Sequence, residues 1–362
     1  MNRSFFLRLW PLAFVFTAVL GVLVFKLVKA SPPLAFPPLP NPNGYDDFVK
    51  ANKLLVGRPL DMIRTNTSTE SLRGFIESNR QSLDLVRVGL SRQSGVRLES
   101  RRDSSNRLEQ LPSFLPLAWT VGAEGKLAEQ EGRTADAINA YLSVIRLGHE
   151  CARGGAVTDR FHSVSGDHFG LTNLRRMKDR LTAGECRDVV KALQVIDANR
   201  EPLADIWPRD EAYMKMMKIF ETGVRERLWY SWFTLTGKKQ RLRQDCERIF
   251  TRSDAYLRLF LSGMAVRCFY LEHGTYPANL ADLMPNYLDA MPLDPFGGKP
   301  LHYRRTSQGF LLYSVGPDGI DDDGKPMPWP PAAPKGDLLF ENPTPGIGEA
   351  DANTGNKPEM KN

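Results

Sequence analysis

From Tyr45 to about Arg248, the apolar residues of this chain recur mostly at steps of three and four. That spacing places them along one side of an α-helix, whereas a half-buried β-strand would need strict alternation. Residues 71–90 show the pattern most clearly, because charged side chains separate the apolar ones. The cluster Thr69-Glu70-Ser71, where this segment opens, offers an N-cap. We therefore predict a mainly α protein in which residues 45–250 form an irregular helical array.

One segment of this array, from Gly125 to Leu147, resembles a single tetratricopeptide repeat. Its small and large residues follow the pattern that lets two antiparallel helices pack closely. The matching positions are Gly125, Gly132, Ala137, Tyr141 and Val144. One repeat cannot stand alone, because such units bury their apolar faces only against neighbours. The array is then either a protein-binding surface or a helical bundle without a binding role.

Composition limits the number of domains and the class of partner. With 362 residues, of which 42% are apolar, the chain is large enough for two folded units. The net charge of +6 comes from 48 basic and 42 acidic residues scattered along the whole length. Nucleic-acid binding usually needs a concentrated basic face, so we expect no nucleic-acid partner.

The cysteines indicate no metal site. Cys151, Cys186, Cys246 and Cys268 have no CxxC pairing and no histidine at zinc-finger spacing. In an exported chain one or two disulfides could form, and the sequence does not choose among the three full pairings. The alternative is four small, buried apolar side chains.

The chain begins with an apolar run that predicts a membrane segment. Leu9 to Phe25 contains 17 residues without a charge, and a helix of about twenty residues spans the hydrocarbon core of a bilayer. We expect residues 1–30 to be a single-pass anchor in a bacterial cell (inner) membrane, with the bulk of the protein extracytoplasmic. The alternative is a signal peptide cleaved before Ser31, which would give a secreted protein.

Two segments predict little regular structure. Residues 31–44 hold six prolines and should form a semi-rigid linker. The tail, residues 326–362, is rich in proline, glycine and polar residues, so we expect it to be disordered or extended.

Between them, residues 251–325 predict a small α+β domain. Arg252 to His273 has apolar residues at helical spacing, and Gly274 follows at the position of a left-handed C-cap. Further along, Leu301–Tyr303 and Phe310–Ser314 are typical of two strands joined by a hairpin.

Three motifs in this domain follow one another in a fixed order. They are YLEHGTYP at Tyr270–Pro277, MPLDPFGGKP at Met291–Pro300 and LYSVGPDG at Leu312–Gly319. This succession resembles the globular part of the major pseudopilin of type II secretion systems. The first residues lack that family's leader and its early glutamate, so we do not expect polymerisation into a pilus. The overall layout also resembles uncharacterised envelope proteins of planctomycete-type bacteria.

A cluster of carboxylates follows the last motif: Asp318, Asp321, Asp322 and Asp323 fall within six residues. Such a cluster repels itself unless solvent screens it or a cation binds. In the pseudopilin family this loop binds Ca²⁺. The resemblance implies that the ligands are the backbone carbonyls of Val315 and Pro317, with the carboxylates of Asp318 and of two among Asp321, Asp322 and Asp323. The alternative is a solvated acidic turn.

The sequence contains no GxSxG, HExxH, Walker or GxGxxG motif, so we expect no enzyme and no small-molecule substrate. We predict a membrane-anchored extracytoplasmic scaffold that binds protein partners and carries a Ca²⁺-binding pseudopilin-like domain. One alternative is an accessory component of a type II secretion or pilus-like system, assembling through the Arg252–His273 helix. The other is a hydrolase in which Asp167, His168 and Glu211 meet in a cleft.

Overall fold

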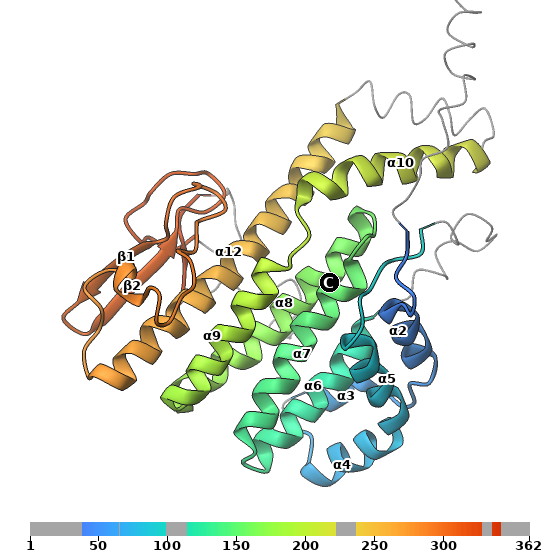
Figure 1. Cartoon of the computed structure of the whole chain (residues 1–362), viewed down its shortest axis with the longest axis horizontal. Coiled ribbons are helices and arrows are strands. Elements are labelled where there is room, and N and C mark those ends of the chain that lie inside the picture. Colours follow the sequence, from blue (N-terminus) through green and yellow to red (C-terminus); the bar gives the residue numbers. More distant parts are fainter. Residues whose placement is uncertain (1–37, 65, 99–113, 222–236, 328–334, 342–362) are drawn as a thin grey trace, which may run out of the picture. The chain divides into compact units, whose positions relative to one another are not determined.

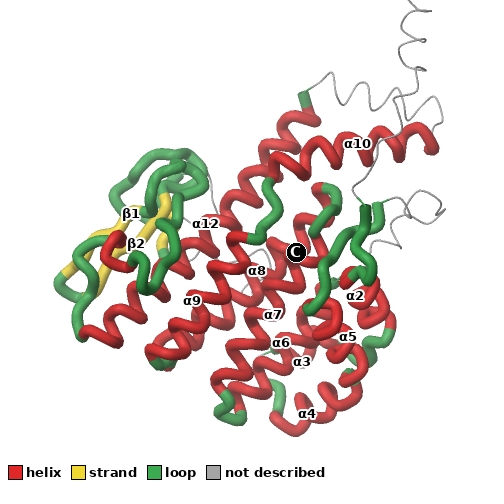
Figure 2. Tube along the Cα trace, viewed as in Figure 1, coloured by secondary structure: helices red, strands yellow, loops and turns green. Residues whose placement is uncertain are grey.

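A computed structural model describes residues 38–64, 66–98, 114–221, 237–327 and 335–341. These residues are mainly helical and carry one small sheet (Figure 1), which confirms the mainly α prediction. Figure 2 shows how few strands accompany the helices. The predicted anchor, residues 1–30, lies outside the described ranges. Within those ranges, no helix combines the length and the apolar character that a membrane crossing needs.

The helices and strands follow in chain order. They are α2 (Gly44–Lys53), α3 (Pro59–Ile63), α4 (Thr69–Ser78), α5 (Arg80–Leu90), α6 (Leu115–Gln130), α7 (Thr134–Ala152), α8 (Val157–Met177), α9 (Ala183–Ala198), α10 (Leu203–Glu221), α12 (Lys238–His273), β1 (His302–Thr306), β2 (Gly309–Ser314) and β3 (Leu338–Leu339). Short 3-10 helices span Lys178–Arg180 and Leu280–Leu283.

The helix predicted over residues 71–90 is divided into α4 and α5 at Asn79. The Asn79 side chain is buried and bonds to the backbone of Val56. Its oxygen accepts from the Val56 N–H at 3.0 Å, and its nitrogen donates to the Val56 carbonyl at 3.2 Å. The N-cap of α4 is Ser68, not the predicted cluster after it, because its hydroxyl accepts the Ser71 N–H at 3.2 Å. The break thus comes from a contact with a preceding loop, which apolar spacing does not reveal.

α6 and α7 form a helical hairpin over the segment that resembles a tetratricopeptide repeat. Gly132 in the connecting turn has a φ of 72°, a conformation that favours glycine. Gly125 of α6 lies against the ring of Tyr141 of α7, where a Cβ would come within 2.6 Å of the ring. A small residue facing a large one lets these two helices pack closely.

α7 and α8 approach each other closely at two glycines. A Cβ on Gly148 would lie 2.6 Å from the carbonyl oxygen of His162 and 3.0 Å from the Cα of Gly166. A larger residue at this contact would force the helices apart. The close approach brings His149 of α7 beside Asp167 of α8, in the charge cluster described below.

α12 begins at Lys238, fourteen residues before the predicted start at Arg252. Residues 238–251 contain no glycine or proline that would end a helix. This early part of α12 also has its own packing partners, since the fully buried Phe250 belongs to an apolar cluster with Val157 and Ile206. The boundary predicted between residues 250 and 251 therefore falls inside one continuous helix.

The other end of α12 agrees with the sequence. The helix ends at Gly274, which has a φ of 70° and donates its N–H to the Tyr270 carbonyl at 2.8 Å, as the predicted C-cap requires.

One continuous cluster of buried side chains runs from α7, α8 and α9 through α12 to the sheet. α12 contributes Phe260 and Met264, both with 0% exposure, and the sheet contributes Leu312 and Leu338. α12 packs against α8 and α9 and also against β2 and β3. The helix is therefore common to the helical array and to the sheet, as its position between them in Figure 1 illustrates.

β1 and β2 form the predicted antiparallel hairpin. Thr306 pairs with Gly309 across a two-residue turn, and β1 continues beyond the predicted strand end at Tyr303. Tyr313 near the end of β2 pairs with Leu339 of β3, which makes β2 the central strand.

The third strand adds a short paired segment within residues 326–362, for which we expected a disordered or extended tail. Leu338 and Phe340 are 1% and 2% exposed, and Leu338 pairs with Ser314 of β2. The ring of Phe340 occupies the space where a side chain on Gly263 of α12 would lie. This short apolar segment was not predicted because the surrounding tail is mostly polar. Its burial on α12 offsets the loss of conformational entropy when it is ordered.

Candidate functional site

The acidic loop after β2 is held by local bonds. Asp321 Oδ1 accepts the Tyr313 hydroxyl at 3.0 Å and the Asp323 N–H at 2.9 Å. Its other oxygen lies 3.3 Å from Nδ1 of His302, and Asp323 Oδ1 lies 3.1 Å from Arg304. Two of the predicted ligands therefore face basic side chains of β1. These exposed contacts offset part of the repulsion within the loop.

The other predicted ligands differ in their exposure and contacts. Asp318 accepts the Ile320 N–H at 3.2 Å, Asp322 and Pro317 are half-buried, and Val315 is buried. Among the described residues, no group of three or more His, Cys, Asp or Glu side chains is arranged to hold a metal ion. Ca²⁺ binding would require the carboxylates of Asp318, Asp321 and Asp323 to exchange their present partners for the ion.

Two buried aspartates that the sequence analysis did not select organise the loop from beneath. Asp337 is 1% exposed and accepts the Gly324 N–H at 2.7 Å. Asp294 is 2% exposed and accepts the Ser314 hydroxyl at 2.9 Å and the Val315 N–H at 2.8 Å. Asp294 lies in the MPLDPFGGKP motif, so the sequence could have identified it as a residue that supports the loop. Asp337 lies in the tail that was predicted to be disordered or extended, and no motif there identified it.

The buried Asp337 is repelled by carboxylates of the acidic loop above it. Burial raises the pKa of the Asp337 carboxyl, and the nearby charges of Asp321 and Asp322 raise it further. The bonds from backbone N–H groups only partly compensate. A cation close to this group of carboxylates would reduce the repulsion.

A second cluster of charges lies in the core where α7, α8 and α12 meet the end of α9. Asp167 is 1% exposed and accepts from His149 Nε2 at 2.7 Å and from the Ser253 hydroxyl at 2.8 Å. Arg200 lies 3.3 Å from Asp167 and also pairs with Asp254. Breaking a buried ion pair of this kind is strongly destabilising, because it leaves a charge without a partner.

The surroundings of Asp167 keep it ionised and His149 neutral. Burial alone would raise the pKa of Asp167, but the hydrogen bond from His149 and the attraction of Arg200 and Arg160 hold that pKa well below its usual value. Burial lowers the pKa of His149, and Arg200 lowers it further, so that the attraction of Asp167 is not sufficient to compensate. A neutral His149 can still donate its Nε2 hydrogen to the carboxylate.

The hydrolase alternative requires Asp167, His168 and Glu211 to meet in one cleft. Asp167 lies on the buried side of α8, whereas His168 is on the exposed side of the same helix. Glu211 of α10 forms an ion pair with Lys239 of α12 at 3.1 Å. Asp167 and His168 thus do not face one cleft, although joint acid and base action needs that proximity.

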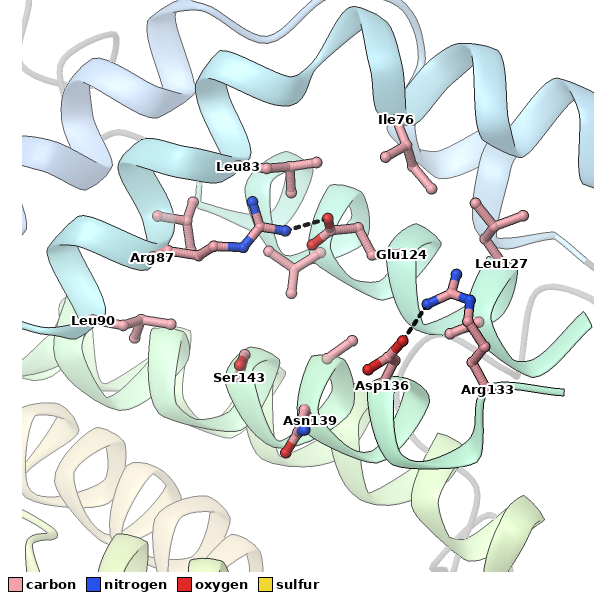
Figure 3. Close-up of a pocket in the computed structure, with 14 residues that line it drawn as sticks. Ile76, Leu83, Arg87, Leu90, Glu124, Leu127, Arg133, Asp136, Asn139 and Ser143 are labelled. Carbon is pink, nitrogen blue, oxygen red and sulfur yellow. Dashed lines mark hydrogen bonds and ion pairs between the residues drawn. The ribbon is translucent and has the colours of Figure 1, made fainter. Parts of the chain in front are cut away.

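The helical array contains a pocket of about 360 Å³ between α4–α5 and α6–α7 (Figure 3), which we call the helical pocket. Its apolar side chains come from α4, α5, α6 and α7. They are Ile76, Leu83, Val86, Leu90, Val121, Leu127, Ala128 and Ala140. Asn139 and Ser143 of α7 add polar groups along one wall. The sequence left open whether this array binds proteins, and no motif in it indicated these residues.

Two ion pairs border the helical pocket. Arg87 of α5 pairs with Glu124 of α6, and Arg133 pairs with Asp136 at the start of α7 (Figure 3). Burial raises the pKa of Glu124, although Arg87 acts in the opposite direction. The apolar lining and internally paired charges suit an apolar group better than a charged ligand, which would have to displace an existing partner.

We predict that acid destabilises the protein through His149. Its pKa is lowered in the folded state, whereas in the unfolded chain it titrates near the ordinary value of 6.5. The unfolded state therefore binds more protons as pH falls through about 6.5, and the free energy of unfolding decreases by up to about 1.4 kcal/mol per pH unit. Urea unfolding at a series of pH values between 7.5 and 5 measures this slope.

The matched variants are His149→Gln and His168→Gln. Gln at position 149 removes the titrating ring and retains a donor for Asp167, so the slope should become shallower. His168 is on the exposed side of α8, and its replacement should keep the wild-type slope. Equal slopes in wild type and His149→Gln would show that this buried ring does not control acid stability.

Comparisons of the chain with protein-family models, with curated proteins and with solved structures find no match.

Proposed function

We propose that this protein is an extracytoplasmic scaffold, anchored in a bacterial cell membrane by residues 1–30, that binds another protein in its helical pocket. The helical pocket supports this proposal, because it lies between helices of the array, has an apolar lining and is bordered by charged side chains. Helical arrays of this kind bury their own apolar faces between neighbouring helices and bind partners along the surface that remains.

The dimensions of the pocket favour a side chain of a partner protein. A volume of about 360 Å³ is at the small end of the range for ligand pockets. Interface anchors are commonly large apolar or aromatic side chains that fill such a pocket, while surrounding polar groups exclude water. Arg87 and Asp136 have side chains that are 56% and 59% exposed, so they can contact the partner around that anchor.

The secretion-system alternative has less structural support. Its assembly surface would be the apolar face of α12, but Leu257, Phe260 and Leu261 on that helix are at most 3% exposed. They are already packed in the core shared with α8, α9 and the sheet. Assembly through this face would require the protein to open its own core.

Site-specific photo-crosslinking tests the pocket as the binding site. A photoreactive amino acid at Ala140, inside the helical pocket, should give a discrete protein adduct in membranes of the native host. The same group at Val195, which is 56% exposed on α9, is the control for random contact. Adding Ser143→Arg, which fills the pocket from α7, should reduce the Ala140 adduct at least tenfold, because loss of about 1.4 kcal/mol suffices for that change.

The same adduct at Ala140 and Val195, or an Ala140 adduct unchanged by Ser143→Arg, would contradict the proposed site. Circular dichroism of the Ser143→Arg variant distinguishes a filled pocket from an unfolded protein.

We further propose that the acidic loop binds Ca²⁺. The support is the density of negative charge, because the loop carries four carboxylates and two of them, Asp321 and Asp322, raise the pKa of the buried Asp337. The ligands would be Asp318, two of Asp321, Asp322 and Asp323, and the carbonyls of Val315 and Pro317. Ca²⁺ accepts six to eight oxygen ligands in flexible geometry, so a loop of this composition can supply much of its shell.

Thermal melts of the full-length protein with and without Ca²⁺ test this proposal. At a hundredfold excess over Kd, binding should add about 2.7 kcal/mol to the free energy of unfolding and raise the Tm. Asp318→Ala should weaken the rise, while Asp188→Ala, an exposed acidic residue on α9, should keep it. Melting temperatures that do not respond to Ca²⁺ in any of the three proteins would exclude a stabilising ion.

A further inference from the structure

Two cysteines lie on opposite sides of the contact between α9 and α12. Cys186 belongs to α9 and Cys268 to α12, and both are 0% exposed in the continuous core cluster. The two helices pack against each other and run side by side in Figure 1. Residues 82 positions apart in the sequence, from 186 to 268, are therefore brought to one interface.

The sulfur of Cys268 contacts the turn of α9 that lies beside Cys186. Cys268 Sγ donates to the carbonyl oxygen of Ala183 at 3.4 Å. A helical carbonyl points towards the residues that follow it, so the Ala183 oxygen lies beside the turn that contains Cys186. Side chains in a helix lean towards the N-terminus, which places the Cys186 sulfur back over the turn of Ala183.

The other two cysteines are held elsewhere. Cys151 is buried in α7, and Cys246 belongs to the separate apolar cluster with Val157, Ile206 and Phe250. The structure thus distinguishes among pairings that the sequence left open, because packing brings Cys268 to the turn of α9 that carries Cys186.

We propose that Cys186 and Cys268 form a disulfide that ties α9 to α12 when the chain folds in an oxidising compartment. Both are free thiols in the structure. Closing the bond removes one hydrogen from each sulfur, and two electrons and two protons pass to a disulfide oxidant such as oxidised glutathione, which becomes two thiols. The extracytoplasmic location belongs to the proposed function, whereas the pairing is tested in vitro and stands independently of it.

The environment of the two thiols determines whether they are oxidised during folding or afterwards. Burial raises the pKa of Cys186 to about 11 and that of Cys268 to about 12, with the charge of Glu272 adding to the second. Because the thiolate is the reactive form, the folded and reduced protein should exchange slowly. The disulfide should therefore form during folding, before the core closes.

Refolding of the full-length protein in a glutathione redox buffer, followed by peptide mapping, tests the pairing. Free thiols are blocked with N-ethylmaleimide in denaturant before tryptic digestion. We expect a peptide pair joined through Cys186 and Cys268, two hydrogens lighter than the sum of its parts, with Cys151 and Cys246 alkylated. Alkylation of all four cysteines, or a different dominant pair, would overturn the proposal.

Stability gives a second readout. Dithiothreitol should lower the Tm of the oxidised wild type but not that of Cys186→Ser/Cys268→Ser. The control Cys151→Ser/Cys246→Ser should keep the response of the wild type. Equal changes in Tm with dithiothreitol in the wild type and in Cys186→Ser/Cys268→Ser would show that this pair is not bonded. If a variant does not fold, peptide mapping of the wild type decides the question.

Discussion

The burial of α12 between the helical array and the sheet is the interaction on which the rest of the structure depends. Phe260 and Met264 are fully buried in a cluster that includes residues of α8 and α9 on one side and of β2 and β3 on the other. A three-stranded sheet with strands of two to six residues has little core of its own. α12 supplies an opposing surface for its apolar face.

Charge placement inside this framework follows from the same packing. The glycine contact between α7 and α8 brings His149 to Asp167, and α12 adds Ser253 and Asp254. Buried ions of this kind add little stability compared with an apolar core, but removing one partner is costly. The cluster therefore makes the relative placement of these helices specific, because a shifted helix would leave a buried charge unpaired.

Sequence analysis predicted the parts of the fold that local physics decides. Helical spacing predicted the helices, and Gly274 predicted the end of α12, because glycine readily adopts the left-handed conformation of a C-cap. The hairpin of β1 and β2 also followed from the turn residues around it. Contacts between distant residues decided the rest. Asn79 breaks a helix by bonding to Val56, and Phe340 packs the short segment of residues 335–341 on α12.

The candidate sites show the same division. The acidic residues of the loop are evident in the sequence, but Asp337 beneath them and the basic residues of β1 beside them become apparent only through tertiary pairing. The helical pocket draws its lining from four helices, so no single motif could identify it.

Native-state hydrogen exchange, followed by mass spectrometry at increasing urea concentrations, tests most directly whether α12 unites the array and the sheet. If one core contains both, amides of β1–β2 and of α8 should converge on the same free energy of opening and the same urea dependence. Exchange of the β1–β2 amides through a separate, lower-energy opening that leaves α8 and the second half of α12 protected would contradict this account.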